Sequence, residues 1–327
     1  MESRTHEGDV SWIQSILDRS CRTPKLAQQA SSSDRLLALL GSADPFLRES
    51  SLDILWTWSH NSLLSGQQLA RIGDRAAANL SVGLGKCDTD SVFLRSFSFL
   101  VLGMVVKVDS LAQMGLHVDL APFLRPEQLL AWLDLVLESL LEENDMRGFI
   151  PGKGWAHATS HAADALRHVA QSRLVGRHEL KRILDATADR LQRPSEHVYA
   201  FNEVENLMSD AYVAILRDLI PLDELRAWIR KRARRPDGRL WESVFSLEAC
   251  DLSTNNARVN TCMALRCFHL LLVLGARGAS ESDGDQRPYF EFLEQAVPHK
   301  EALLREAQDA LRSTNRELFG DVAPPIG

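Results

Sequence analysis

The chain has 327 residues and a net charge of −7, with 45% hydrophobic and 25% charged residues. These values are close to those of globular proteins and exclude a wholly disordered chain, and an acidic chain does not favour nucleic-acid binding. Leucine fills 51 positions, whereas there are only three tyrosines. This balance favours helices over sheets, because strands prefer β-branched and aromatic residues. We therefore expect an all-α protein.

Cysteine content and targeting signals indicate a cytoplasmic protein. The five cysteines include no Cys-x-x-Cys pair, so we expect neither a disulfide framework nor a zinc ribbon, and a reducing compartment is the simplest interpretation. Residues 1–12 are polar and lack the apolar core of a signal peptide. The most apolar stretch, 97–106, is too short to span a bilayer. We expect no membrane association.

Apolar residues recur with the helical period along most of the chain, and no segment shows a run of alternating apolar and polar residues. Ser33-Asp34 and Asp44-Pro45 are typical helix starts, and Pro126 precedes a strong apolar face. The predicted helices, besides one after Ser33, cover 8–20, 46–60, 66–82, 90–106, 126–141, 155–172, 177–191, 203–219, 222–234, 256–275, 287–296 and 298–316.

Short loops between these helices favour helix pairs stacked as a HEAT-like αα-superhelix or a related helical-repeat packing. A globular bundle and a closed αα-barrel stay open as alternatives. The segments 144–154, 235–241 and 278–288 are predicted loops, and the last is predicted to be mobile because it is rich in Gly, Ser, Asp and Pro. None resembles an interdomain linker, so we expect a single domain over residues 1–327.

The segment 154–164 carries the best candidate site. On a continuous helix, His157, His161, Asp164 and His168 would lie within a stripe about 60° wide. His157 and His161, four residues apart, can both reach one metal ion. Asp164 lies roughly 10 Å along the axis from His157, so a carboxylate from elsewhere completes a metal site more easily.

Glu203 is the candidate for that carboxylate, and it shares a helix face with Asn206 and Asp210. Two imidazoles and a carboxylate suit a divalent metal such as Zn, Fe or Mn. Two other interpretations stay open. The histidines can be structural, with Asp164 bound to Arg167 or Lys153. They can also form a metal-free site, in which His157, His161 and Asp164 are the catalytic residues of acid–base chemistry.

The loop before this segment predicts a binding pocket for an anion. Arg147, Lys153 and three glycines lead into a predicted helix start at Trp155, and exposed amides at a helix start favour anions. Arg147, Lys153, Trp155 and Asn206 are therefore the candidate substrate-binding residues. An ordinary interhelix loop is the alternative. The basic run 226–239 is interpreted as a solvated helix end, with contact to phosphates as its alternative.

Three blocks of sequence resemble a known family. Phe93-Leu94-Arg95-Ser96-Phe97-Ser98, Asp145-Met146-Arg147-Gly148-Phe149 and Gly-Trp-Ala-His-Ala-x-x-His-x-Ala-Asp over 154–164 are similar to blocks of an uncharacterised bacterial all-helical family, classed as a domain of unknown function. The resemblance covers about residues 40–275 and implies a helical fold without a known activity. Where that family has an acidic Glu-Asp-Glu-Arg-Leu-like segment, this chain has Val204 and Asn206 in place of the Asp and Arg.

Together these observations predict a small-molecule enzyme or ligand-binding protein. Its pocket would be lined by residues 145–168 and the helix that carries Glu203, with or without a metal. The competing hypothesis is a helical-repeat scaffold whose concave face binds a protein or peptide partner.

Overall fold

The computed structural model describes residues 2–117, 119–241, 251–278, 284 and 286–314. Fourteen α-helices make up 68% of the chain in the described part, and the only strands there are two residues long each, so the all-α prediction is confirmed. The contacts divide the chain into two compact units, residues 1–175 and 176–327, which we describe separately. The single domain stays a prediction, and most of the segment 278–288 lies outside the described residues.

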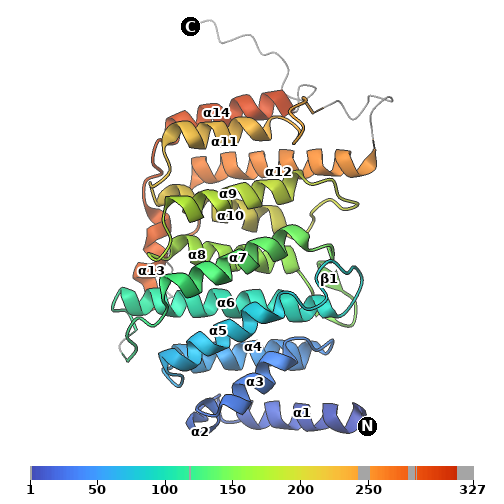
Figure 1. Ribbon diagram of the computed structural model, residues 1–327, viewed down its shortest axis with the longest axis vertical. Helices are drawn as coiled ribbons and strands as arrows, with labels where there is room; N and C mark the ends of the chain where they lie inside the picture. Colours follow the sequence, from blue (N-terminus) through green and yellow to red (C-terminus); the bar gives the residue numbers. More distant parts are fainter. Residues whose placement is uncertain (1, 118, 242–250, 279–283, 285, 315–327) are drawn as a thin grey trace, which may run out of the picture. The chain divides into compact units, whose positions relative to one another are not determined.

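The first unit contains eight helices and one small hairpin (Figure 1). They are α1 (Glu2–Leu17), α2 (Pro24–Ala27), α3 (Ala30–Leu39), α4 (Pro45–His60), α5 (Gly66–Asn79), α6 (Ser91–Gln113), α7 (Pro126–Glu142), β1 (Phe149–Ile150), β2 (Gly154–Trp155) and α8 (Ala158–Gln171).

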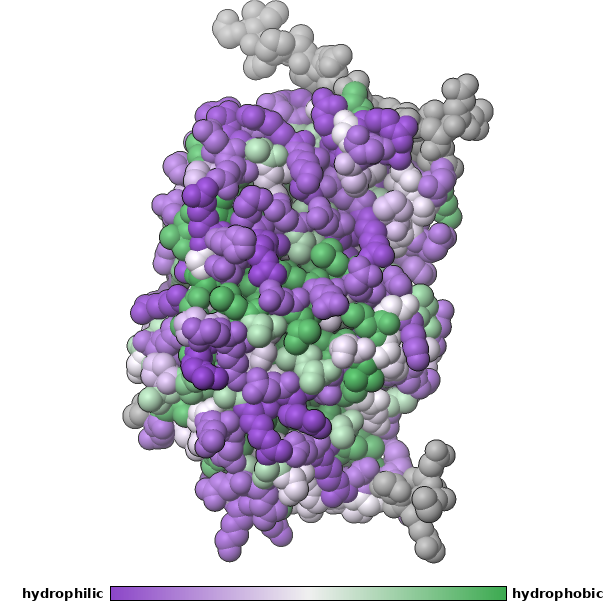
Figure 2. All heavy atoms as spheres, in the orientation of Figure 1, coloured by the Kyte–Doolittle hydropathy of each residue, from purple (hydrophilic) through white to green (hydrophobic). Residues whose placement is uncertain are grey.

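Local sequence explains where several of these helices begin. The Asp44 carboxylate accepts a hydrogen bond from the Phe46 amide, and Pro45 occupies the first turn of α4. Ser65 and Gln68 form a reciprocal capping box at the start of α5. Pro126 opens α7 as the apolar spacing predicts. Figure 2 shows hydrophilic side chains over most of the face in view, with smaller apolar areas between them.

Helix α6 forms the core of the first unit and packs most extensively against α8. A Cβ atom on Gly103 would lie 3.1 Å from His168 and 3.3 Å from the Ala165 backbone, so the missing side chain lets the two helices approach closely. Helix α6 is longer than predicted. In the described part of the chain, α6 and α12 are long and apolar enough to cross a membrane, but 83% of the apolar window of α6 is buried inside the protein, as in a core helix.

The hairpin β1–β2 precedes α8 and was not predicted. Phe149 pairs with Trp155 and Ile150 with Gly154, in antiparallel register. Gly154 has a φ of +82°, and a Cβ atom there would lie 3.0 Å from the guanidinium of Arg48. Both facts require glycine at this position. The hairpin shortens the helix predicted from residue 155, which begins at Ala158 instead.

The second unit contains six helices in its described part. They are α9 (Arg177–Gln192), α10 (Glu203–Leu216), α11 (Leu222–Arg232), α12 (Leu252–Leu274), α13 (Arg287–Glu291) and α14 (Lys300–Thr314), with a short 3₁₀ turn at Phe292–Glu294. Helix α12 packs against α9, α10 and α14. Arg226 and Arg230 of the basic run bind Glu306 on α14, so a protein carboxylate, and not solvent alone, holds these two side chains of the predicted solvated helix end.

Candidate functional site

Polar residues of α8 form a stripe that is less buried than the rest of the helix. His161, Asp164 and His168 keep part of their surface exposed, whereas the apolar residues of the helix and its two hydroxyl residues are buried. The predicted stripe therefore exists on the helix. His157 stands directly before α8, with a φ of 54° in the left-handed region, so the helix does not run through it as the sequence suggested.

Ser96 on α6 holds the His161 ring in place. The Ser96 hydroxyl donates a hydrogen bond to the Ala156 carbonyl, and the distance between Ser96 Oγ and His161 Nδ1 is 2.7 Å. A carbonyl oxygen only accepts, so the single hydroxyl proton points to Ala156. Nδ1 of His161 must then carry a proton and donate it to Ser96, which leaves the lone pair of the neutral ring on Nε2.

His161 is partly buried. Part of its side chain stays exposed, yet burial lowers its pKa to about 3, helped by the charges of His157 and Arg48. Burial of this degree disfavours the charged form of the ring. The imidazole is therefore neutral at physiological pH.

Aromatic rings form a row from the protein interior to the hairpin. The ring centre of Phe97 lies 5.4 Å from that of His161, and the centres of His161 and His157 are 5.6 Å apart. The row continues from His157 to Trp155 at 5.0 Å and from Trp155 to Phe149 at 5.3 Å. Trp155 is 40% exposed and Phe149 is 50% exposed, so the outer end of the row offers apolar surface to a ligand.

Arg48 on α4 is a buried cation beside this site that sequence reasoning missed. Its guanidinium donates to the carbonyls of Ser42 at 2.8 Å and Lys153 at 2.6 Å, and it lies 4.1 Å above the ring of Phe93. Burial lowers its pKa. Arg48 ties the turn of the hairpin to α4. No local pattern marks it, because Lys153 lies 105 residues away in sequence.

Asp164 binds Arg167, as one of the structural alternatives predicted. Arg167 Nη2 lies 2.8 Å from Asp164 Oδ1. Burial raises the pKa of Asp164, while the charges of Arg167 and His157 oppose that shift.

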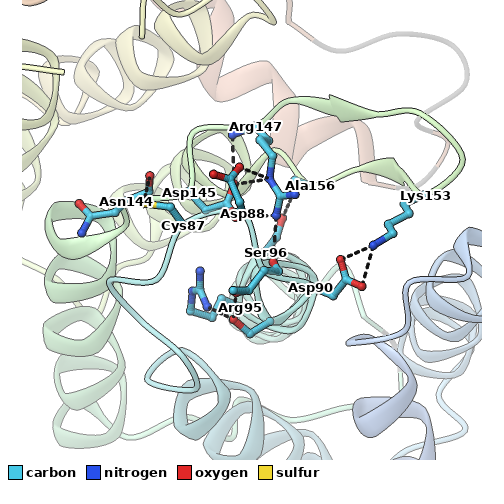
Figure 3. A network of polar contacts seen from close by, with 12 residues as sticks. Cys87, Asp88, Asp90, Arg95, Ser96, Asn144, Asp145, Arg147, Lys153 and Ala156 are labelled. Carbon is cyan, nitrogen blue, oxygen red and sulfur yellow. Dashed lines mark hydrogen bonds and ion pairs between the residues drawn. The ribbon is translucent and has the colours of Figure 1, made fainter. Parts of the chain in front are cut away.

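Arg147 and Lys153, the two predicted anion-binding cations, each bind a carboxylate of the protein (Figure 3). Arg147 contacts both oxygens of Asp145, at 2.8 and 2.6 Å, and Lys153 contacts both oxygens of Asp90, at 2.7 and 2.8 Å. These pairs fix the loop around the hairpin. An anion would have to compete with them, so the predicted pocket for an anion gains no support here.

The loop is also anchored at its start by Arg95. The Arg95 guanidinium binds the Glu143 carboxylate through two hydrogen bonds, and Glu143 in turn accepts from the Asp145 amide at 2.9 Å. Arg95 and Ser96, neighbours on α6, thus hold the two ends of the segment that leads into α8. Neither residue was a predicted site residue.

Glu203 and Asn206 lie on α10, in the second unit. Glu203 is buried and accepts a hydrogen bond from the Phe201 amide at 2.7 Å, a local role at the helix start. Its predicted convergence with the histidines stays a prediction. Among the described residues, no group of three or more His, Cys, Asp and Glu side chains could hold a metal ion.

Comparison with known proteins gives one match. No curated protein and no solved structure matches the chain. A family model described as "Protein of unknown function (DUF2785)" matches residues 80–270. This match covers α6, the hairpin and α8, where the resemblance was found in the sequence, and more than half of the chain. The chain therefore belongs to the DUF2785 family of proteins of unknown function.

Proposed function

We propose that the partly exposed surface around His161 on α8 binds a small molecule that donates a hydrogen bond to Nε2 of His161. The arrangement of Ser96, His161 and Ala156 carries this proposal. It holds a neutral imidazole in one tautomer, with its lone pair on the ring nitrogen that Ser96 does not bind. Such a group selects N–H and O–H donors, because it has no proton of its own to give at that position.

The aromatic row indicates the shape of the ligand. Trp155 is tilted by 30° relative to His157 and is 40% exposed on its hairpin, so a planar ring can lie against it. We therefore propose a planar small molecule with an amide, amine or hydroxyl group. His157 and Asp164 are the groups that would exchange a proton with it if the protein is an enzyme.

A metal at the same place is the second candidate. Two imidazoles bound to one tetrahedral zinc ion have ring centres about 5 Å apart, and the 5.6 Å between His157 and His161 is compatible with this. The bond from Nδ1 of His161 to Ser96 resembles the second bond that metal-bound histidines usually make. In the described part of the chain, no third candidate ligand accompanies the two histidines. We therefore rank the metal site second to the metal-free site.

Calorimetric titration tests the proposal. The probes are nicotinamide, adenine and indole-3-acetamide, and zinc and manganese chlorides test the second candidate. His161→Asn keeps an amide N–H near the position of Nδ1 and removes Nε2. We expect at least one planar probe to bind the wild-type protein and to bind this variant about tenfold more weakly. The control is His178→Asn, at an exposed position on α9. Equal affinities in the wild type and His161→Asn would contradict the proposal.

Two broader expectations stay proposals. Cytoplasmic location is supported by the four cysteines in the described residues, Cys21, Cys87, Cys262 and Cys267, which are all free thiols. HEAT-like pairing is supported by the packing of chain neighbours against each other, such as α3 on α4 and α9 on α10.

A further inference from the structure

One face of α12 leaves apolar side chains uncovered next to an exposed arginine. Only 44% of the apolar window of this helix is buried. Leu270, Val273 and Leu274 are 53%, 45% and 77% exposed. Arg266, also exposed, precedes them at helical spacing, so these four residues lie on one side of the helix. We call the set of Arg266, Leu270, Val273 and Leu274 the α12 strip.

A groove runs beside the α12 strip. Helix α14 packs antiparallel to α12: Cys262 lies near the end of α14, and Lys300 at its start donates to the Val273 carbonyl at 3.3 Å. Between the two helices lies a groove of about 480 Å³. The groove is lined by Arg266, His269, Leu270, Gln308, Leu311 and Arg312. Its floor is apolar and its rim is basic.

The charge around this groove is opposite to that of the whole chain. Arg305 and Arg312 lie on the exposed side of α14 and add to Arg266 of the α12 strip. Arg312 pairs with Asp309 at 2.9 Å, whereas Arg266 and Arg305 are exposed. A net positive rim around an apolar floor, in a chain with a charge of −7, complements an acidic partner.

We propose that this groove and the α12 strip bind an acidic amphipathic helix of a partner protein. A helix that lies in a groove buries apolar residues spaced three and four apart and turns its charged face to the rim. From Arg266 to Leu274 the α12 strip is about 12 Å long at 1.5 Å per residue, enough for about two turns of a partner helix. The concave groove between two helices favours an inserted side chain over the flat surface of a membrane.

Fluorescence anisotropy with a labelled synthetic peptide tests this binding on the full chain. The probe is a peptide of about five helical turns, with leucine on one face and glutamate on the other. The comparison peptide carries lysine in place of glutamate. We expect saturable binding of the acidic peptide, affinity at least about tenfold weaker for the lysine peptide, and weaker binding as salt increases.

Two variants and a matched control locate the binding. Leu270→Asp and the double charge reversal Arg266→Glu/Arg312→Glu should each weaken binding of the acidic peptide about tenfold. Leu252→Asp makes the same change at the other end of α12, where Leu252 is 63% exposed, and should leave binding unchanged. Circular dichroism confirms that each variant is folded.

Three results would overturn the proposal. The first is equal binding of both peptides or undiminished binding by Leu270→Asp. The second is sedimentation with phosphatidylglycerol vesicles that Leu270→Asp abolishes, which would identify a membrane surface. The third is a dimer in analytical ultracentrifugation that the same substitution dissociates, which would identify a second copy of the chain.

Discussion

Arg95 and Glu143 form a paired hydrogen bond inside the protein, with Nε to Oε2 at 2.7 Å and Nη2 to Oε1 at 2.8 Å, and neither side chain reaches the solvent. Arg95 also donates to the Val82 carbonyl at 2.9 Å. The pair connects α6 to the end of α7 and to the loop that leads into the hairpin. Its role is therefore to position the site.

Glu143→Ala should strongly destabilise the first unit, because it leaves the Arg95 guanidinium charged, buried and without its carboxylate. Removal of one partner of a buried pair costs about 3–5 kcal/mol. Urea denaturation measures the free energy of unfolding. As a control, Asp185→Asn removes the exposed pair with Lys181 and should cost less than about 1 kcal/mol. Similar losses of unfolding free energy in the two variants would mean that the buried pair stabilises the protein no more than the exposed pair does.

The ring proton of His161 should reside on Nδ1 at pH 7. Long-range proton–nitrogen NMR of the histidine rings distinguishes the two neutral tautomers, because protonated and unprotonated ring nitrogens have different shifts. Ser96→Ala should mix the tautomers and cost about 1–3 kcal/mol of stability, since it leaves buried polar groups without a partner. A spectrum with the proton on Nε2 in the wild type would remove the basis of the proposed ligand chemistry.

His157→Gly should keep or increase stability and weaken ligand binding. The backbone at His157 has a φ of 54°, which glycine adopts without steric cost, and non-glycine residues held there for function carry about 1 kcal/mol or more of strain. Thermal melts measure the effect. Leu137→Ala, in the buried face of α7, is the control and should cost about 2–5 kcal/mol. A large loss in His157→Gly would assign this histidine a structural role.

Stability should fall as pH decreases from about 6.5. Burial lowers the pKa of His161 to about 3 and that of His60 to about 4. The charges of Lys107 and His117 also lower the pKa of His60. Between these values and the higher pKa of an unfolded histidine, the unfolded chain binds more protons, so acid favours unfolding. Each histidine contributes a slope of at most about 1.4 kcal/mol per pH unit.

The raised pKa of Asp164 acts in the opposite direction. The folded carboxyl holds its proton above the pKa of the unfolded group, so its contribution is present at low pH and is lost as pH rises. Urea unfolding at several pH values between 5 and 7.5 measures the sum. His60→Asn should make the pH dependence shallower than in the wild type, and an unchanged slope would refute the assignment to this histidine.

The helices could be predicted from the sequence because their signals are local. Asp44-Pro45 and Pro126 open helices where expected, and apolar spacing places α7 within a residue of its observed end. The hairpin was missed because its strands have two residues each, too few to show alternation. The stripe on α8 was predicted from spacing alone.

The parts of the site that depend on distant contacts could not be predicted. Arg48 reaches the hairpin from α4, and Ser96 reaches His161 from α6. Neither residue stands in a pattern that indicates its partner. The left-handed backbone at His157 was also missed, because histidine gives no signal of the kind that glycine gives at Gly154. Helical spacing therefore placed His157 on a helix that begins one residue later.

Arg48 anchors the hairpin, yet it lies outside the segment that the family model matches. The limits of the family therefore differ from the limits of a stably folded fragment. The matched segment starts at residue 80, whereas the guanidinium that holds the Lys153 carbonyl and covers Phe93 belongs to α4. A fragment cut at the family limits would keep His161 and Ser96 but would expose Phe93 and release the turn beside Trp155. Measurements on such a fragment would report His161 without the contacts that shape its surroundings, so relatives should be compared with their preceding helices included.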